Sequence, residues 1–105
     1  MSLDYAVEKF TSAVAYAASS PGSVQERLAG AFVDYILFVS QEGIRPELWQ
    51  RIAKLTEDVT RISARGTEGD VRATTSQMST EEAARHLKEI VDISYRLESE
   101  YRFKN

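Results

Sequence analysis

Apolar residues recur every three or four positions in four separate stretches of this chain, and this spacing constrains the fold more than any other feature. It keeps side chains on one face of an α-helix, whereas a strand needs strict alternation, which no stretch shows. The third stretch is the clearest, with a 4-3-4-3 pattern formed by Leu48, Ile52, Leu55, Val59 and Ile62. The sequence therefore predicts an all-α protein with helices over residues 3–18, 23–41, 46–65 and 80–103.

Residues that start and stop helices set these boundaries. Ser23 and Ser79 are each followed by glutamate three residues later, the spacing of a helix-opening capping box. Gly43 and Gly66 suit helix ends, and Pro46 suits a first helical turn. The short connections after the first two helices favour antiparallel neighbours.

Residues 67–78 are polar and lack an apolar period, so we predict one longer, mobile loop between the third and fourth helices. Together with the helix boundaries, this predicts an antiparallel up-down four-helix bundle. The bundle forms a single domain over residues 1–105.

Composition excludes several classes of protein. A length of 105 residues and a net charge of −3 indicate one domain with no strongly basic region for nucleic acid or an anionic membrane. No apolar run reaches the roughly 18 residues that a membrane span needs. The absence of cysteine excludes disulfides and thiolate metal sites. We therefore expect a cytoplasmic protein.

The predicted helix over residues 23–41 is more apolar than a helix with one face in water requires. Between Leu28 and Val39 only Asp34 is charged. An apolar arc of roughly 100° or somewhat more is enough for such a helix, so the surplus needs a second surface to cover it. We predict a non-catalytic interaction module that forms a homodimer or binds a protein partner through its first two helices. The predicted interface residues are Ala13, Ala17, Val33, Asp34, Leu37 and Phe38.

The last predicted helix gives one alternative with catalytic chemistry. Glu89 and Asp92 have the E-x-x-D spacing of one half of the magnesium site of all-α nucleoside-triphosphate pyrophosphatases, which use two acidic pairs. The matching E-x-x-E pair is missing from this chain. A small magnesium-dependent nucleotide-hydrolysing enzyme using Glu89 and Asp92 is therefore an alternative. The main prediction has no catalytic residue, no cofactor and no metal.

The third predicted helix gives a second alternative, a weak nucleic-acid-binding regulator. Its basic side chains lie near one face, where they would contact phosphates. They are Arg51, Lys54, Arg61 and Arg65. Glu57 and Asp58 interrupt this basic stripe, which disfavours nucleic acid as a partner.

Overall fold

The computed structural model describes residues 3–103, and this part of the chain contains five α-helices and one short 3-10 helix. They are α1 (Leu3–Ser19), α2 (Val24–Asp34), the 3-10 helix η1 (Ile36–Phe38), α3 (Pro46–Val59), α4 (Gly66–Ser76) and α5 (Thr80–Arg102). No strand occurs within residues 3–103, which confirms the predicted all-α class. None of the described helices combines the length and the apolar character needed to cross a membrane. The structure has five α-helices where the sequence predicted four.

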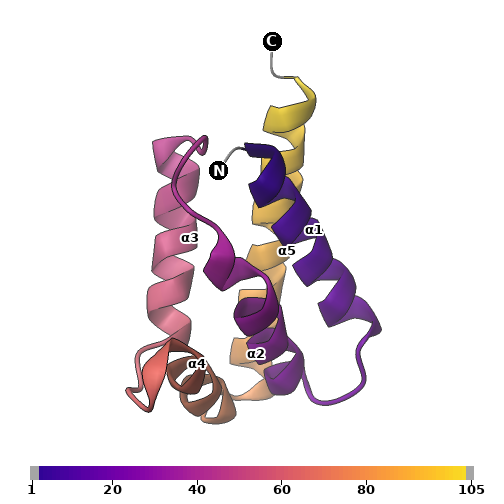
Figure 1. The fold of residues 1–105 in the computed structure, drawn as a ribbon. Helices are drawn as coiled ribbons and strands as arrows, with labels where there is room; N and C mark the ends of the chain where they lie inside the picture. The colour runs from indigo at the N-terminus through magenta and orange to yellow at the C-terminus, as the bar shows by residue number, and fades with distance from the viewer. Residues whose placement is uncertain (1–2, 104–105) are drawn as a thin grey trace.

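Figure 1 shows α1, α2, α3 and α5 running alternately down and up, with α4 crossing the end of the molecule away from the termini. α2 is the central helix and contacts α1, α4 and α5. α1 and α5 form the most extensive helix pair. α3 makes fewer contacts, mainly with α5 and α4. Pockets open on two sides of α5, one set beside α3 and one pocket beside α1.

The core is built from the apolar stripes that the sequence predicted. In α3 the stripe is buried from Leu48 to Val59, whereas Ile62 lies beyond the end of the helix and is 36% exposed. Burying each large apolar side chain contributes about 1.5–3 kcal/mol. Among the largest fully buried side chains are Phe10, Leu28, Phe32, Ile36, Ile52, Ile90, Ile93 and Leu97.

The predicted caps begin two of the helices. The Ser23 hydroxyl accepts a hydrogen bond from the Glu26 amide at 3.0 Å, and the Glu26 carboxylate accepts one from the Ser23 amide at 2.8 Å. These two bonds, the backbone one first, lower the pKa of Glu26 below its usual value. At α5 the Ser79 hydroxyl accepts from the Glu82 amide at 3.0 Å. Caps of this kind satisfy amides that have no partner inside the helix.

The prediction that the second helix extends to residue 41 is wrong, because α2 ends at Asp34. The backbone leaves the helical conformation at Tyr35 (φ −133°, ψ −59°), and η1 follows. The chain must then travel from the middle of the molecule to the far end of α3 (Figure 1). Extended residues advance about 3.3 Å each against about 1.5 Å in a helix, so an extended segment makes this crossing in fewer residues. Gly43 does take a left-handed conformation (φ 82°), but in the turn that leads into α3.

The prediction that the third helix extends to residue 65 is also wrong, since α3 ends at Val59. The backbone amides that would continue it are held by side chains of α4. The fully buried Thr74 hydroxyl accepts from the Ile62 amide at 2.9 Å, and the Asp70 carboxylate accepts from the Ala64 amide. α4 therefore fixes the chain that follows α3.

The predicted mobile loop over residues 67–78 is helix α4 in the structure. Its buried side chains, followed by that of Met78, have helical spacing. They are Val71, Thr74 and Thr75. Because two of the three are threonines, the segment has little hydropathy pattern although it has a buried face.

Candidate functional site

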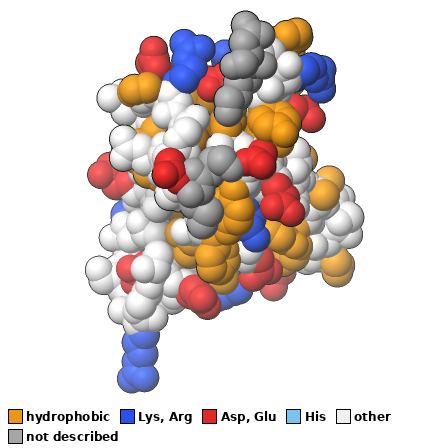
Figure 2. Space-filling model, turned by 45° about the horizontal axis from the view of Figure 1, so that its top comes forward, with side chains coloured by type: hydrophobic (Ala, Val, Ile, Leu, Met, Phe, Trp, Pro, Cys, Tyr) orange, Lys and Arg blue, Asp and Glu red, His pale blue; other side chains and the backbone are white. Residues whose placement is uncertain are grey.

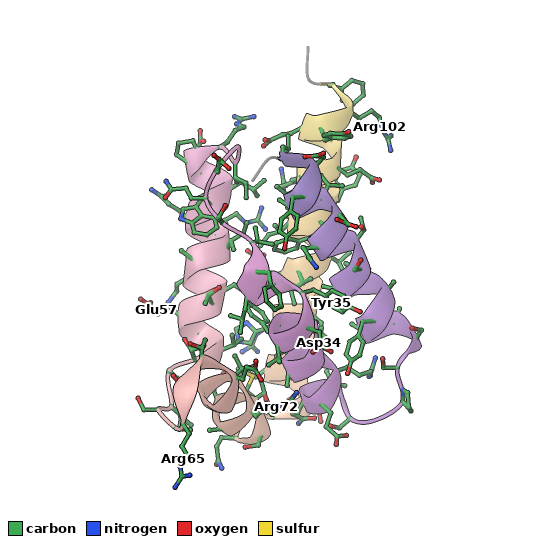
Figure 3. All side chains as sticks on the ribbon, in the orientation of Figure 1. Asp34, Tyr35, Glu57, Arg65, Arg72 and Arg102 are labelled. Atoms are coloured by element: carbon green, nitrogen blue, oxygen red, sulfur yellow. The ribbon has the colours of Figure 1, made fainter. Side chains whose placement is uncertain are left out.

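The six predicted interface residues divide into buried and exposed groups. Ala13, Ala17 and Val33 are buried within the chain itself, and Leu37 is half-buried against the core. Asp34 and Phe38 are exposed, and Figure 3 shows Asp34 near the end of α2. The structure therefore brings together no continuous surface from these six side chains.

The apolar surplus of α2 is covered inside the chain. Six residues in succession, from Leu28 to Val33, are buried. They are covered because α1, α4 and α5 surround α2 on several sides. A helix at the centre of a small all-α protein is apolar around most of its circumference. The apolar side chains of α2 are therefore covered by helices of the same chain, and no second chain is needed to bury them.

Phe38 belongs to an aromatic cluster that encloses a lysine. The Lys9 ammonium lies 5.4 Å from the ring centre of Tyr5, 6.0 Å from that of Tyr35 and 5.6 Å from that of Phe38. These distances are typical of cation–π contacts. The exposed ring of Phe38, at 54% exposure, is thus already engaged by a cation of its own chain.

Glu89 and Asp92, the acidic pair of the magnesium alternative, are joined to α3 by Arg51. The Arg51 guanidinium donates to both Glu89 oxygens at 2.9 and 2.7 Å and to Asp92 Oδ2 at 2.8 Å. Arg96 also donates to Asp92 Oδ2, at 2.9 Å. The bonds to Glu89 and Asp92 raise the pKa of Arg51, and those from Arg96 and Arg51 lower the pKa of Asp92.

This arrangement is an ion-pair network rather than an open cation site. Both carboxylates are neutralised by guanidinium groups, so a magnesium ion would have to displace Arg51 to reach them. No group of three or more acidic or histidine side chains within residues 3–103 is placed to hold a metal ion. The residues present therefore do not fit the magnesium alternative in this conformation.

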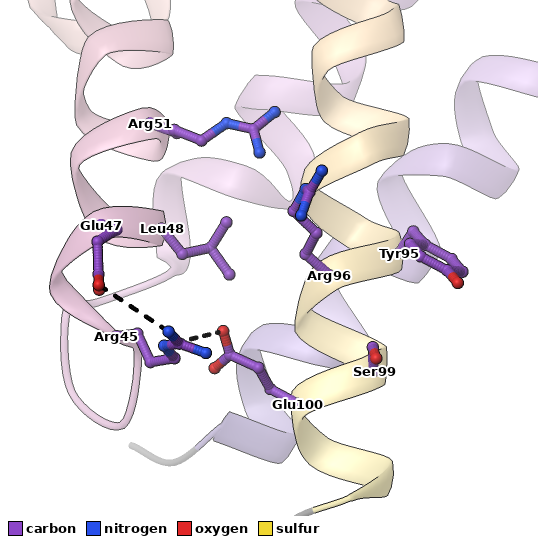
Figure 4. A pocket seen from close by; sticks show the side chains of 8 residues that line it. All are labelled: Arg45, Glu47, Leu48, Arg51, Tyr95, Arg96, Ser99 and Glu100. Atoms are coloured by element: carbon purple, nitrogen blue, oxygen red, sulfur yellow. Dashed lines mark ion pairs between the residues drawn. The ribbon is translucent and has the colours of Figure 1, made fainter.

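The groove between α3 and α5 continues beyond this network as a pocket of about 350 Å³ (Figure 4). Arg45 lines this pocket, and its guanidinium nitrogens lie 3.9 Å from a carboxylate oxygen of Glu47 and 3.8 Å from one of Glu100. Leu48 and Arg51 project into the groove from α3, and Tyr95 contributes to the lining of the pocket from α5. Arg45 and Glu100 thus pair across the pocket, whereas Arg51 and Arg96 pair with acidic side chains of the neighbouring network.

The basic residues of the nucleic-acid alternative do not form one surface. Lys54 pairs with Asp58 at 3.1 Å, and this contact raises the pKa of Lys54. Arg61 lies beyond α3 and pairs with Glu82 of α5 at 3.4 Å. Arg65 is exposed and points away from the rest of the molecule in Figure 3. These side chains face different parts of the surface, and most are neutralised by acids.

The sequence did not predict the outer groove between α1 and α5, which has a volume of about 330 Å³. Apolar side chains make up most of its lining, with Arg27 and Lys88 as its charged members. Val91 is 51% exposed at its edge, and Tyr95, one turn further along α5, is 70% exposed. The apolar lining comprises Val14, Ala17, Ala18, Ala84, Leu87, Ile90 and Val91.

The described surface therefore offers two contrasting regions along α5. The α3 side carries ionic groups that satisfy one another, and the α1 side carries apolar side chains open to water. In Figure 2, which views the molecule partly from the end with the termini, hydrophobic side chains reach the surface in separate patches among acidic ones. Comparison with protein-family models, with curated proteins and with solved structures finds no match to this chain.

Proposed function

We propose that the chain is a non-catalytic helical-bundle interaction module that binds a protein through the outer face of α1 and α5. The observation that carries the proposal is the apolar groove between these helices, with Val91 and Tyr95 exposed beside it. Contiguous apolar surface on small proteins marks contact sites, and tyrosine is enriched among the side chains that dominate binding energy. The proposal keeps the module predicted from the sequence but moves its contact from α2 to α5.

The build of this face suits a docking surface. α1 and α5 form the most extensive helix pair, so the groove lies on a rigid base. Ala18 and Ala84 are small and exposed, which lets the backbone of a partner approach closely. Such preformed surfaces lose little conformational freedom on binding. We place the module in the cytoplasm, in keeping with its lack of cysteine.

The magnesium and nucleic-acid alternatives have less support. Each requires side chains that are already engaged, since Arg51 occupies Glu89 and Asp92, and Lys54 and Arg61 pair with acids. The outer face of α1 and α5 requires no such rearrangement.

A site-specific photo-crosslinker tests the proposal. The benzophenone amino acid is placed at Val91, and at Ala53 on the exposed side of α3 as the matched control. After irradiation in the native host cells, the adducts are identified by mass spectrometry. We expect one discrete protein adduct from position 91 and none from position 53. Equal labelling from both positions, or no adduct from position 91, would overturn the proposal.

A further inference from the structure

The outward side of α5 carries a second regular stripe beside the seam that it buries, about 100° further round the helix. Its members follow a 4-3-4-3 spacing and are all exposed. This spacing is the pattern by which helices pair along their length. We call it the outer stripe; it comprises Ala84, Lys88, Val91, Tyr95 and Glu98.

The outer stripe is self-complementary when reversed. Val91 and Tyr95 each lie two residues from position 93, and Lys88 and Glu98 each lie five residues from it. The two apolar side chains are thus flanked by opposite charges at equal distances, each three residues or about 4.5 Å further along the helix axis. If a second α5 helix lies antiparallel to the first, with the two helices level at residue 93, Lys88 of each helix lies opposite Glu98 of the other.

From this relationship we infer that a second copy of the chain binds here, with the two α5 helices antiparallel across a two-fold axis near position 93. The inference rests on the proposed function and names the partner. Val91 packs against the partner's Tyr95, and Lys88 meets the partner's Glu98. A two-fold axis makes each of these contacts twice.

The neighbouring side chains fit this arrangement. Val91 also lines the α1–α5 groove, so the partner's Tyr95 ring would lie at the edge of a space of about 330 Å³. Among residues 3–103, Glu98 has only a long contact with Arg102, at 3.8 Å between exposed side chains, which leaves its carboxylate open to another cation. Within the described part of the chain, Lys88 makes no ion pair.

The charges of the outer stripe also favour an antiparallel second copy over a parallel copy or an unrelated helix. A parallel pairing of two copies would place Lys88 against lysine and Glu98 against glutamate, and like charges at such positions are unfavourable. An unrelated helix of one charge sign would match one end of the outer stripe and clash with the other. The reversed copy of the same stripe matches both ends.

Sedimentation equilibrium of the whole chain tests the inference at micromolar concentration. We expect a dimer, twice the 11.8 kDa of one chain. Lys88→Glu and Glu98→Lys each create two like-charge contacts and should weaken the dimer at least tenfold. The double variant Lys88→Glu with Glu98→Lys restores opposite charges and should recover most of that loss. Glu57→Lys on α3 changes the net charge as Glu98→Lys does and should leave the dimer intact, and circular dichroism checks that every variant is folded.

The outcomes separate this inference from the proposed function. A wild-type monomer overturns the inference, as does a double variant no tighter than the single variants. If the chain is monomeric and position 91 still crosslinks to a different protein, the proposed function stands and the second copy is excluded. If position 91 crosslinks to nothing and the chain is monomeric, both are overturned.

Discussion

The ring of Tyr16 lies directly on Gly30, so that α1 and α2 meet with no space for a side chain at position 30. A Cβ atom built on Gly30 would overlap the tip of the Tyr16 ring. Gly30 is buried within α2, and Tyr16 also packs on Tyr35 with ring centres 6.1 Å apart. The absence of a side chain at Gly30 is therefore what allows the two helices this contact.

We predict that Gly30→Ala destabilises the protein although alanine is the better helix former. Alanine in place of glycine inside a helix ordinarily gains about 0.5–1 kcal/mol, but overpacking costs about 1–3 kcal/mol. We expect a lower free energy of unfolding, measured by urea denaturation. Gly69→Ala in α4 is the matched control, because its Cβ would lie at ordinary contact distance, 3.4 Å, from the Ala64 side chain. A Gly30→Ala variant as stable as wild type would contradict the contact.

Thr74→Val should loosen the segment that joins α3 to α4. The substitution keeps the shape of the side chain but removes the acceptor for the Ile62 amide. A fully buried amide without a partner costs about 1–3 kcal/mol, and the Ile62 amide, whose bond to Thr74 is only partly buried, should cost less. We expect faster hydrogen exchange over residues 60–66 and a lower free energy of unfolding. Thr75→Val is the control, since the Thr75 hydroxyl makes only a long bond of 3.4 Å to the Arg72 carbonyl; equal effects of the two variants would count against the role of Thr74.

Arg51→Met should weaken the attachment of α3 to α5. Arg51 makes a two-point contact with Glu89 and a third bond to Asp92, and its side chain is 33% exposed. Because water screens a partly exposed pair, we expect a loss of about 1 kcal/mol in chemical denaturation. Arg51→Lys should not restore the loss, because an ammonium group lacks the planar fork. Lys54→Met, which removes a more exposed pair, should cost less; the reverse order would contradict the network.

Asp92 should make stability depend on pH in the acid range. Hydrogen bonds from Arg96 and then Arg51 hold the pKa of Asp92 below its usual 3.8. A carboxyl whose pKa is lower in the folded state stabilises the fold above its unfolded pKa and loses this contribution as pH falls through the folded pKa. We expect wild type to be more stable than Asp92→Asn at pH 7, with the difference shrinking from about pH 5 to about pH 2. The free energy of unfolding of both proteins across this range provides the measurement, and a constant difference would exclude the effect.

Much of the fold was predictable because local signals were strong. α1 and α5 begin and end within a residue of the predicted bounds. α5 has a serine cap at its start and a buried stripe along its length, and both were visible in the sequence. α4 was missed because Thr74 and Thr75 occupy its buried face, and threonine carries no hydropathy signal. The end of α2 at Asp34 depends on where α3 lies, which no local pattern encodes.

The candidate site was predictable only in part. The sequence indicated an interaction surface but placed it on α2, whose apolar residues instead fill the centre of the fold. The spacing of Val91 and Tyr95 was present in the sequence, yet it runs beside a stronger buried stripe on the same helix. Arg51 and Glu89 are 38 residues apart, so their contact depends on how α3 and α5 rotate about their own axes.

Because α3 is weakly attached, the free energy of local opening should differ from one part of the molecule to another. α1, α2 and α5 contact one another extensively, whereas α3 has fewer neighbours and shares an ionic cluster with α5. Because α4 packs extensively on α2 and α3 does not, α3 should separate from the rest before global unfolding, while Thr74 and Asp70 hold the chain after it to α4. Salt screens exposed ion pairs and leaves apolar packing intact, so raising the ionic strength should lower the free energy of this partial opening more than that of complete unfolding. The amides of residues 46–59 would then exchange faster as the salt concentration rises, while those of α1 and the middle of α5 would not.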